Sequence, residues 1–417
     1  MRWIFIILII FWRGYVTCLA QLSLDECQQL ARENYPMIKQ FDLIEKSKEM
    51  NLSNAARAYL PQFSMTGIAS LVYGLSEMSM LGAEAPENKH HKFLGIAQLN
   101  QVIWDGGSTK ARQKIMAATA EVDRQNIEVI LYTINERINQ IYLGILLIDE
   151  QLKQVDILDD NLSKNLKRAE TACKNGTVYP SDLDKIRVEI LNSGQSRINL
   201  NSQRKAYIEM LSVMINKNLD PDIQLNTLTD NGTVLTETIN RPELSLYKQQ
   251  RLLYDAQNLV YNSRIMPKIG LMGYAIGLAP GIKLGNSNMD HLLMAGVSLS
   301  WNIGGLYTRK NDRNIIKINQ LMLDAQQEAF LFNTNLELKQ SNEQVKRTKQ
   351  LMDKDDEIIS LCENIKRATE IKYENGACTM TDLVNDINAE NMARQNKALH
   401  KIEYLMSIYI YKTISGN

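Results

Sequence analysis

The sequence predicts a mainly α-helical protein in which long coiled-coil hairpins are joined to a β segment, with this arrangement present twice in one chain. Three observations predict it. The 417-residue chain repeats a set of short motifs at an offset of about 200 residues. Each half holds a very long segment without proline and with apolar residues at heptad spacing. Each half also holds two segments in which apolar and small or polar residues alternate, as strands require.

The N-terminal segment has the form of a secretory signal peptide. Arg2 is followed by an apolar run over residues 4–12, and Cys18-Leu19-Ala20 places small residues before a cut at Gln21. We therefore expect residues 1–20 to be a signal peptide, too short to span a bilayer. Lipidation of Cys18 is an alternative, although residues 15–17 are unfavourable at the positions before the acylated cysteine of a lipoprotein.

The composition of the remaining chain argues against a nucleic-acid partner. Residues 1–20 contain two arginines and no acid, so 45 basic and 47 acidic side chains remain. With nearly equal numbers of basic and acidic side chains, the chain lacks the net positive charge that would indicate nucleic-acid binding. The same remainder contains no apolar run of eighteen residues, so no transmembrane helix is predicted.

The four remaining cysteines are widely spaced and form no CxxC motif, which argues against a zinc or redox site. We interpret them as small buried residues of helices. A bridge between Cys173 and Cys378 stays open, because both lie near similar loops. The four cysteines are Cys27, Cys173, Cys362 and Cys378.

The internal repeat defines the predicted organisation of the chain. The first repeat covers 21–220, residues 221–240 form a linker, and the second repeat covers 241–417. Six matched motifs recur in the same order, with an offset that drifts only as loop insertions would cause. They are Asn34-Tyr35-Pro36 with Asn240-Arg241-Pro242, Pro61 with Pro267, Gly67 with Gly273, Gly106-Gly107 with Gly304-Gly305, Asn175-Gly176 with Asn375-Gly376, and Asp182-Leu183 with Asp382-Leu383.

In the first repeat, residues 24–60 are helical in character and Pro61 ends the helix. Residues 62–75 alternate, with Phe63 and Met65 on one face and Ser64 and Thr66 on the other. We expect a strand there, a loop over 76–91, and a second strand over 92–104.

The second repeat shows the same pattern more clearly. After its first helix, residues 268–279 alternate between large residues such as Tyr274 and small ones such as Gly273. After a turn-rich stretch, residues 291–303 form the most regular predicted strand, with Leu293 and Val297 on its apolar face. Period-two segments of about ten residues suit a membrane β-barrel, but they suit any half-buried sheet as well.

Each repeat then continues into a long helix. A helix from 108 to 173 would be roughly 100 Å long at 1.5 Å per residue. Its apolar stripe steps by three and four residues, and Asp159 is the one polar member. The stripe consists of Ile127, Leu131, Ile134, Ile138, Ile141, Ile145, Ile148, Leu152, Val155, Asp159, Leu162, Leu166, Ala169 and Cys173.

The counterpart helix over 307–374 has a looser stripe. Both long helices stop at Asn-Gly, where glycine can take the left-handed conformation that ends a helix, and both restart within a few residues. The sequence therefore predicts two antiparallel hairpins with tips at 174–181 and 374–381.

No pattern in the sequence indicates an enzyme. None of the four histidines has a partner at metal-ligand or triad spacing, and His90 and His91 lie in the expected first loop. The acidic pairs Asp159-Asp160 and Asp355-Asp356 are expected to lie on solvated helix faces. We predict no catalytic residue, no metal site and no cofactor.

Together these features resemble the TolC-like outer membrane efflux protein family over essentially the whole chain after residue 20. Four short patterns carry the resemblance. They are Leu60-Pro61-Gln62 before the first strand, Asp105-Gly106-Gly107 before the long helix, Arg241-Pro242-Glu243-Leu244 at the second repeat, and Asn-Gly followed six residues later by Asp-Leu at both tips.

The resemblance implies a homotrimer in which each subunit gives four strands to a twelve-stranded barrel. It implies that the barrel lies in the lipid of the cell outer membrane and that the helices form a periplasmic tunnel. The tips would dock onto a periplasmic adaptor and an inner-membrane pump, in an efflux or type I secretion system. The docking residues would be Asn175, Gly176, Thr177, Asn375, Gly376 and Ala377.

The resemblance also implies a constriction at the periplasmic entrance. Asp382 matches the family's acidic ring, Asp182 is its counterpart in the first repeat, and Tyr373 matches a residue of the closed-state network. Asn385 stands where a second ring aspartate is expected, which implies weaker cation selectivity. Cys378 stands where a constricting arginine is expected. For the two aspartates, helix capping is an equally good interpretation.

Two other classes of function remain open at this point. A periplasmic coiled-coil adaptor or scaffold without a channel would explain the heptads and the signal peptide, but it leaves the duplicated strands without a role. A secreted enzyme would need a site that the sequence does not show.

Overall fold

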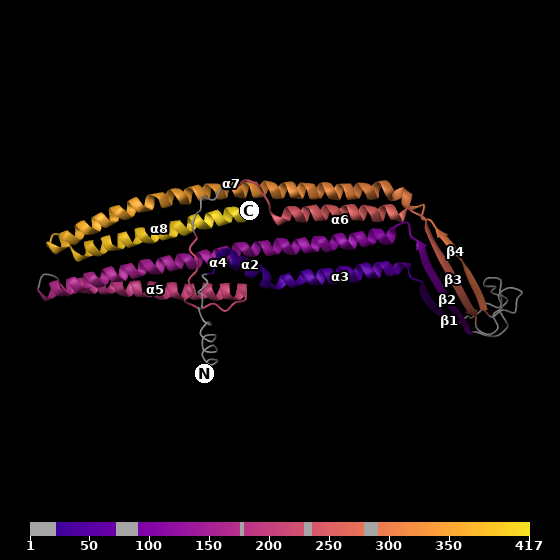
Figure 1. The fold of residues 1–417 in the computed structure, drawn as a ribbon, viewed down its shortest axis with the longest axis horizontal. Coiled ribbons are helices and arrows are strands. Elements are labelled where there is room, and N and C mark those ends of the chain that lie inside the picture. The colour runs from indigo at the N-terminus through magenta and orange to yellow at the C-terminus, as the bar shows by residue number, and fades with distance from the viewer. Residues whose placement is uncertain (1–21, 72–90, 176–178, 229–235, 279–290) are drawn as a thin grey trace, which may run out of the picture. The chain divides into compact units, whose positions relative to one another are not determined.

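The computed structural model describes residues 22–71, 91–175, 179–228, 236–278 and 291–417 (Figure 1). The predicted fold class is confirmed: long helices are combined with four antiparallel strands, and in each half of the chain helical segments precede two strands and a hairpin of long helices. The expected signal peptide with Cys18, and the residues His90, Gly176 and Thr177, lie outside the described residues.

The described residues of the first repeat form four α-helices, two strands and two short 3-10 turns. They are α2 (Leu24–Asn34), η1 (Pro36–Ile38), α3 (Lys39–Ala56), η2 (Arg57–Tyr59), β1 (Gln62–Leu71), β2 (His91–Trp104), α4 (Ser108–Lys174) and α5 (Pro180–Ile215). The part of the second repeat that the structure describes forms three α-helices and two strands. They are α6 (Pro242–Arg264), β3 (Lys268–Leu278), β4 (His291–Ser300), α7 (Gly305–Glu374) and α8 (Met380–Ser415).

Three local expectations were wrong. The helix expected over residues 24–60 is interrupted at Tyr35, which takes an extended conformation because Pro36 follows it. His91 begins β2 and does not lie in a loop. β4 ends at Ser300, three residues before its expected end, and the indole of Trp301 donates a hydrogen bond to the Ile265 carbonyl at 3.0 Å.

Two compact units cut across the two repeats, so each unit takes residues from both. Unit 1 comprises the described residues up to Ile38 together with Glu128–Pro242 and Phe330–Asn417. Unit 2 comprises Lys39–Ile127 and Glu243–Ala329. The repeat is therefore a property of the sequence, whereas packing joins the corresponding halves of the two repeats.

The core of unit 1 is built on the predicted stripe of α4. Leu131, Ile138 and Ile145 are fully buried, as the heptad pattern requires. Asp159, the polar member of the stripe, accepts a hydrogen bond from Arg197 of α5 at 2.5 Å, so the charge is paired across the hairpin. Gly144 leaves room for the ring of Tyr207, which an added Cβ would meet at 2.9 Å.

Unit 2 contains the sheet. The strands pair antiparallel in the order β1-β2-β3-β4, and the register shifts between Val102 and Trp104 where β2 has a bulge. Its helices make polar contacts with one another: Arg251 of α6 pairs with Asp324 of α7, and Gln113 of α4 donates to the Leu52 carbonyl of α3. No helix in the described part of the chain is long and apolar enough to cross a membrane.

Candidate functional site

One face of the sheet is almost entirely apolar. Because directly opposed residues of antiparallel strands share a face, the register assigns every strand residue to one side. Among the side chains that the structure describes on this face, Gln101 and His291 are polar. Its other members are Phe63, Met65, Gly67, Ala69, Gly95, Ala97, Leu99, Ile269, Leu271, Gly273, Ala275, Gly277, Leu293, Ala295, Val297 and Leu299.

The large residues of this face are exposed in the single chain. Met65 is 76% exposed, Leu293 75% and Leu299 71%. A continuous exposed apolar surface of this kind marks contact with a membrane or another protein. The opposite face is mixed. It carries Gln62, Ser64, Thr66, Ile68, Leu94, Ile96, Gln98, Asn100, Lys268, Gly270, Met272, Tyr274, Ile276, Leu292, Met294, Gly296, Ser298 and Ser300.

The position of the large residues of β3 could not be read from alternation alone. Tyr274 lies opposite Gln98 and Met294, and the Tyr274 hydroxyl is 3.3 Å from the Gln98 amide nitrogen. Gly273 and Ala275, the small residues of β3, belong to the apolar face with Leu99 and Leu293. The apolar face thus combines large residues from all four strands with small residues such as Gly273 and Ala275.

The sheet is open at both edges in the described residues. β1 and β4 each pair with one neighbour only, so the outer N–H and C=O groups of both strands face no strand of this chain. Four strands are too few to close on themselves. Strand edges of this kind pair with another chain or need protection.

The junction between β2 and α4 is held by Asp105, which is buried at 6% exposure. Its carboxylate accepts hydrogen bonds from the amides of Gly107 at 3.0 Å and Thr109 at 2.6 Å, and from the hydroxyl of Tyr59 at 3.0 Å. Burial acts to raise the pKa of Asp105, but the hydrogen bonds from Thr109, Tyr59 and Gly107 outweigh it and lower the pKa. Gly106 is required, because an added Cβ would meet the Met266 Cβ at 2.4 Å.

The two hairpin tips of unit 1 share a small core and a pocket. A buried cluster joins α4, α5 and α8 through Leu162, Leu183 and Leu383, among others. Beside it lies a pocket of about 980 Å³ between the two tips. Asp182, Lys185 and Tyr373 line this pocket, whereas Asp382 and Asn385 do not. The site residues expected from the sequence are thus divided between the pocket and the exposed start of α8.

Asp382 has the capping role. The Thr379 hydroxyl accepts from the Asp382 amide at 3.2 Å, and the Asp382 carboxylate accepts from the Thr379 amide at 2.9 Å, which forms a complete capping box. The side-chain hydrogen bond from Thr379 is the main cause that lowers the pKa of Asp382. The carboxylate is exposed and ionised at neutral pH, so it is also available to other groups.

Asp182 occupies the same position in the first repeat but has different contacts. The helix cap there is Tyr179, whose side chain makes no capping hydrogen bond. Lys185 approaches the Asp182 carboxylate at 3.1 Å and donates to the Thr381 hydroxyl at 2.8 Å, so one lysine links the two hairpins. Lys185 was not predicted as a site residue, because nothing in the sequence places it beside Thr381.

Tyr373 lies beside Asp182 in the pocket. Burial and the charge of Asp182 raise the pKa of the Tyr373 phenol. Its hydroxyl oxygen is buried and has no hydrogen-bond partner among the described residues. Leaving a buried hydroxyl without a hydrogen-bond partner is energetically costly.

The remaining expected tip residues are exposed or unbridged. Asn385, Asn375, Gly376 and Ala377 are exposed, as is Asn175. The four cysteines of the described residues are free, so no bridge joins Cys173 to Cys378, which was an open alternative. Cys378 instead lies 3.5 Å from the Thr369 carbonyl, with its sulfur as donor.

One expectation about charged residues was wrong. Asp355 does not lie on a solvated face: it is 3% exposed, and both of its carboxylate oxygens lie within 3.0 Å of His400 Nδ1. The partner is 45 residues away on α8, beyond any short sequence motif. Among the described residues no group of three acids, histidines or cysteines is arranged to hold a metal ion.

Comparison with known proteins shows which class of proteins shares this fold. No family model and no curated protein matches the sequence. Solved structures do match. CusC, whose structures concern transmembrane channel formation, has a TM-score of 0.71 at 11% identity, over 95% of this chain and 93% of CusC. The outer membrane protein VceC of Vibrio cholerae has a TM-score of 0.69 at 10% identity, over 94% and 96% of the two chains.

The Campylobacter jejuni outer membrane channel CmeC has a TM-score of 0.66 at 14% identity, over 97% of this chain and 87% of CmeC. The chain therefore has the fold of outer-membrane channel proteins. The resemblance to the TolC-like outer membrane efflux proteins is confirmed at the level of the fold, across nearly the whole length of these structures.

Proposed function

We propose that this chain is one subunit of a homotrimeric outer-membrane channel, the passive exit duct of a tripartite efflux or type I secretion system. A periplasmic adaptor and an inner-membrane pump would open it. The observation that carries the proposal is the four-stranded sheet, which combines an exposed apolar face with two unpaired edges. The likeness in fold to CusC, VceC and CmeC supports it.

The physical argument concerns the backbone. In lipid, each unpaired N–H or C=O group costs several kcal/mol, so an open sheet cannot be exposed there. Pairing β4 of one copy with β1 of the next removes both edges and keeps the apolar face outside and the mixed face inside. Two copies would also satisfy this argument, and the number three comes from the TolC-like family. The helices would then lie in the periplasm.

The first test is the mass of the detergent-extracted protein, measured by light scattering with correction for bound detergent. A trimer that needs detergent to remain in solution is the expected result. A monodisperse species that is soluble without detergent would overturn the proposal in favour of the alternative, a periplasmic coiled-coil scaffold. Carbonate washing of cell envelopes tests membrane insertion independently, because a membrane-embedded barrel protein stays in the membrane pellet whereas a scaffold protein is released.

We further propose that the tips form the entrance and its constriction. Asp382 is exposed and ionised at the start of α8, and Asp182 and Tyr373 line the pocket between the tips. Asn385 stands one turn after Asp382 and adds no charge. The exposed residues Asn175, Asn375 and Ala377, with Gly176, Thr177 and Gly376, would contact the adaptor.

Replacing Asp382 tests the entrance separately from the cap. Asp382→Ala is expected to lower cation preference and to raise the low resting conductance in a planar bilayer, because a ring of three carboxylates is lost. Thr379→Val is the matched control, since it removes the cap and keeps the charge. Unchanged selectivity and conductance in Asp382→Ala would leave only the capping role.

A further inference from the structure

The four places where the sheet of unit 2 passes into helices lie at one end of the sheet. β1 begins after η2, β2 ends before α4, β3 begins after α6, and β4 ends before α7. Because the strands pair antiparallel in the order β1-β2-β3-β4, these four strand ends lie side by side (Figure 1). We call this end of the sheet the junction end. It brings together residues that are far apart in the sequence.

The junction end is rich in positive charge. The ten residues on the helical side of each strand end are 52–61, 105–114, 258–267 and 301–310, and together they contain seven lysines and arginines and one acid. Of the 47 basic and 47 acidic side chains of the whole chain, 40 and 46 lie elsewhere. All seven basic residues are exposed. They form the basic collar, which consists of Arg57, Lys110, Arg112, Lys114, Arg264, Arg309 and Lys310.

No acid of the described residues lies within ion-pair distance of the collar. The one acid of the four stretches, Asp105, is 6% exposed and is hydrogen bonded within the junction. Arg264 lies over the ring of Tyr261, 5.0 Å from its centroid, and this neutral partner leaves the charge uncompensated. Lys110 and Lys114 are one turn apart on α4, where like charges repel each other. An anionic partner would relieve this repulsion.

Large aromatic residues lie between the collar and the apolar face of the sheet. Trp104 lies opposite Ile269 of that face and is 43% exposed. Trp301 follows β4 and is 55% exposed, and Tyr307 in the first turn of α7 is 85% exposed. Tryptophan and tyrosine are enriched where a bilayer meets water, because each has an apolar ring and a polar group. If the sheet lies in lipid, the junction end therefore lies at the level of the headgroups.

The collar is close enough to a headgroup layer to interact with it. Lys114 lies six residues after Ser108, the first residue of α4, which is about 9 Å along the helix. Lys310 lies five residues after Gly305, the first residue of α7, which is about 8 Å. Both distances are comparable to the Debye length of roughly 8–10 Å at physiological ionic strength. The long side chains of lysine and arginine can also extend back toward the interface.

We infer that the basic collar binds the anionic headgroups of phospholipids, in the membrane leaflet that borders the helices. The inference rests on the proposed function, because it requires the sheet to lie in a bilayer. Charge complementarity selects this partner: a headgroup with a net negative charge is attracted to the collar, whereas a zwitterionic one has no net charge to attract. The guanidinium groups of the collar can in addition donate two parallel hydrogen bonds to a phosphate.

Fluorescence quenching by brominated lipids tests the inference with native reporters. Trp104 and Trp301 are the two tryptophans after residue 20, and both lie at the junction end. The protein, with removal of residues 1–20 checked by its mass, is reconstituted in mixed vesicles of phosphatidylcholine and phosphatidylglycerol. One lipid at a time carries bromine on its acyl chains, and the two quenching curves give the relative binding of the lipids. A preference of at least about fivefold for phosphatidylglycerol is expected, the effect of one lysine or arginine near an anionic surface.

A variant of the collar tests which residues cause the preference. Lys110→Gln, Lys114→Gln, Arg309→Gln and Lys310→Gln together remove four of the seven positive charges and leave Asp105 and its hydrogen bonds in place. The preference is expected to fall to less than about half of the native value, as loss of surface attraction requires. The matched control removes four exposed lysines of unit 1 and should keep the native preference. It consists of Lys205→Gln, Lys217→Gln, Lys346→Gln and Lys354→Gln.

Two further measurements use the native protein and need no variant. Sodium chloride should reduce the preference, because the Debye length falls to about 3 Å at 1 M salt. Soluble glycerol phosphate at millimolar concentration should leave the preference unchanged, because the collar is inferred to bind a charged membrane surface. Loss of the preference in glycerol phosphate would overturn the inference, since the collar would then be a site for free anions.

The remaining outcomes separate the inference from the proposed function. A membrane-inserted trimer without a preference between the two lipids would overturn the inference and leave the channel proposal standing. A preference that both the collar variant and salt leave unchanged would do the same. A protein that neither brominated lipid quenches, and that carbonate releases from envelopes, would refute the channel proposal itself.

Discussion

The two helical hairpins of unit 1 keep the same register but differ in the chemistry of their cores. In the first hairpin, Leu166 and Ile190 pack against the apolar tip cluster. The residues 200 positions later are Lys366 and Glu390, which form an ion pair at 2.5 Å with the Glu390 side chain 5% exposed. The same hairpin geometry is thus filled once by an apolar pair and once by a charged pair.

A second pair of positions shows the same difference. Val155 is buried in the first hairpin, and Leu200 lies on its returning helix. Their counterparts 200 residues later are Asp355 and His400, which are hydrogen bonded to each other. A third pair of positions is charged in both hairpins.

That third pair is Asp156 with Arg197 in the first hairpin, at 2.5 Å, and Asp356 with Lys397 in the second. The comparison teaches that the duplicated register depends on spacing from the tip and not on residue type. A buried ion pair is often no more stable than an apolar pair of similar volume. A buried ion pair does, however, disfavour a shift of one helix of the hairpin along the other, because both charges would then be left unpaired.

The largest expected effect is in the second hairpin. Glu390→Ala removes the acceptor of both Lys366 and Arg394, which are only partly exposed, and is expected to destabilise the protein by about 2–3 kcal/mol. Thermal unfolding of the detergent-extracted protein, followed by circular dichroism, measures it. Ile190→Ala at the matched position of the first hairpin should cost about 1 kcal/mol, since Ile190 is half-buried. If Glu390→Ala and Ile190→Ala lost the same stability, the cores of the two hairpins would not differ in this way.

The strand-to-helix junctions of the two repeats differ as well. Asp105 holds the first junction, whereas in the second the Trp301 indole binds the Ile265 carbonyl. Asp105→Asn places an amide beside backbone donors and should destabilise the protein by about 2 kcal/mol. Because the pKa of Asp105 is lowered in the fold, its contribution is complete above the ordinary value of 3.8 and is lost as pH falls through the lower folded pKa.

Acid titration of the far-UV signal in the native protein and in Asp105→Asn measures this contribution. The variant should show a smaller loss of stability below pH 4, because its junction no longer has a carboxylate to protonate. Trp301→Phe is the matched change at the second junction, and it should leave the acid profile unchanged. If Asp105→Asn had the native acid profile, the assigned role of Asp105 would be wrong.

A smaller effect is expected at the helix starts of the two tips. Thr379→Val removes the capping box of α8 and should cost about 1 kcal/mol, with faster hydrogen exchange in the first turn of α8. Tyr179→Val at the matched position of α5 should leave exchange in α5 unchanged, because the Tyr179 side chain makes no capping bond. Similar exchange in both variants would show that the tips do not differ in this respect.

The smallest effect is expected when the second hairpin is made like the first. The double substitution Lys366→Leu, Glu390→Ile replaces the ion pair by the residues of the first hairpin. Stability should stay within about 1 kcal/mol of the native protein, because the lost Coulomb attraction is offset by the removed desolvation cost. Arg394 keeps Glu363 as a partner. A loss as large as that of Glu390→Ala would show that the ion pair itself is required.

Much of the fold could be predicted because its determinants are local. The heptad stripe of α4 predicts its buried residues, and Asn-Gly at both tips predicts where the long helices end. The alternating segments contain the four strands. The family resemblance assigned both Asp182 and Tyr373 to the periplasmic constriction, which stays a prediction, and both residues line the tip pocket.

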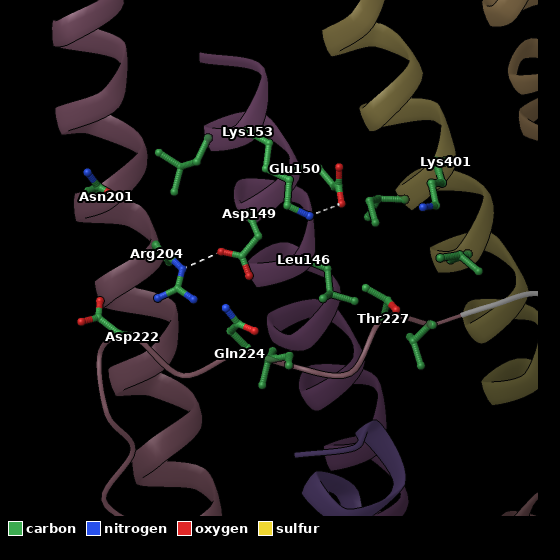
Figure 2. A pocket seen from close by; sticks show the side chains of 15 residues that line it. Leu146, Asp149, Glu150, Lys153, Asn201, Arg204, Asp222, Gln224, Thr227 and Lys401 are labelled. Carbon is green, nitrogen blue, oxygen red and sulfur yellow. Dashed lines mark hydrogen bonds and ion pairs between the residues drawn. The ribbon is translucent and has the colours of Figure 1, made fainter. Parts of the chain in front are cut away.

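The pocket at the middle of unit 1 illustrates the opposite case. Arg204 of α5 donates to Asp149 of α4 at 2.6 Å (Figure 2). Arg204 also donates to the Ile223 carbonyl at 2.7 Å, which ties the linker after α5 to the hairpin. Lys401 of α8 lines the same pocket. The sequence shows three charged residues on three helices, and nothing in their spacing brings them together.

The sequence by itself determined the duplicated order of strands and hairpins, the lengths of the two long helices and the positions of the tips, because each depends on residues close together in the chain. The tertiary structure alone decided three other matters. Strand register placed the small residues of β3 on the apolar face. Packing buried Asp355 against His400 and joined Lys185 to Thr381. Each of these depends on residues tens to hundreds of positions apart, whose encounter is fixed by the packing of whole elements.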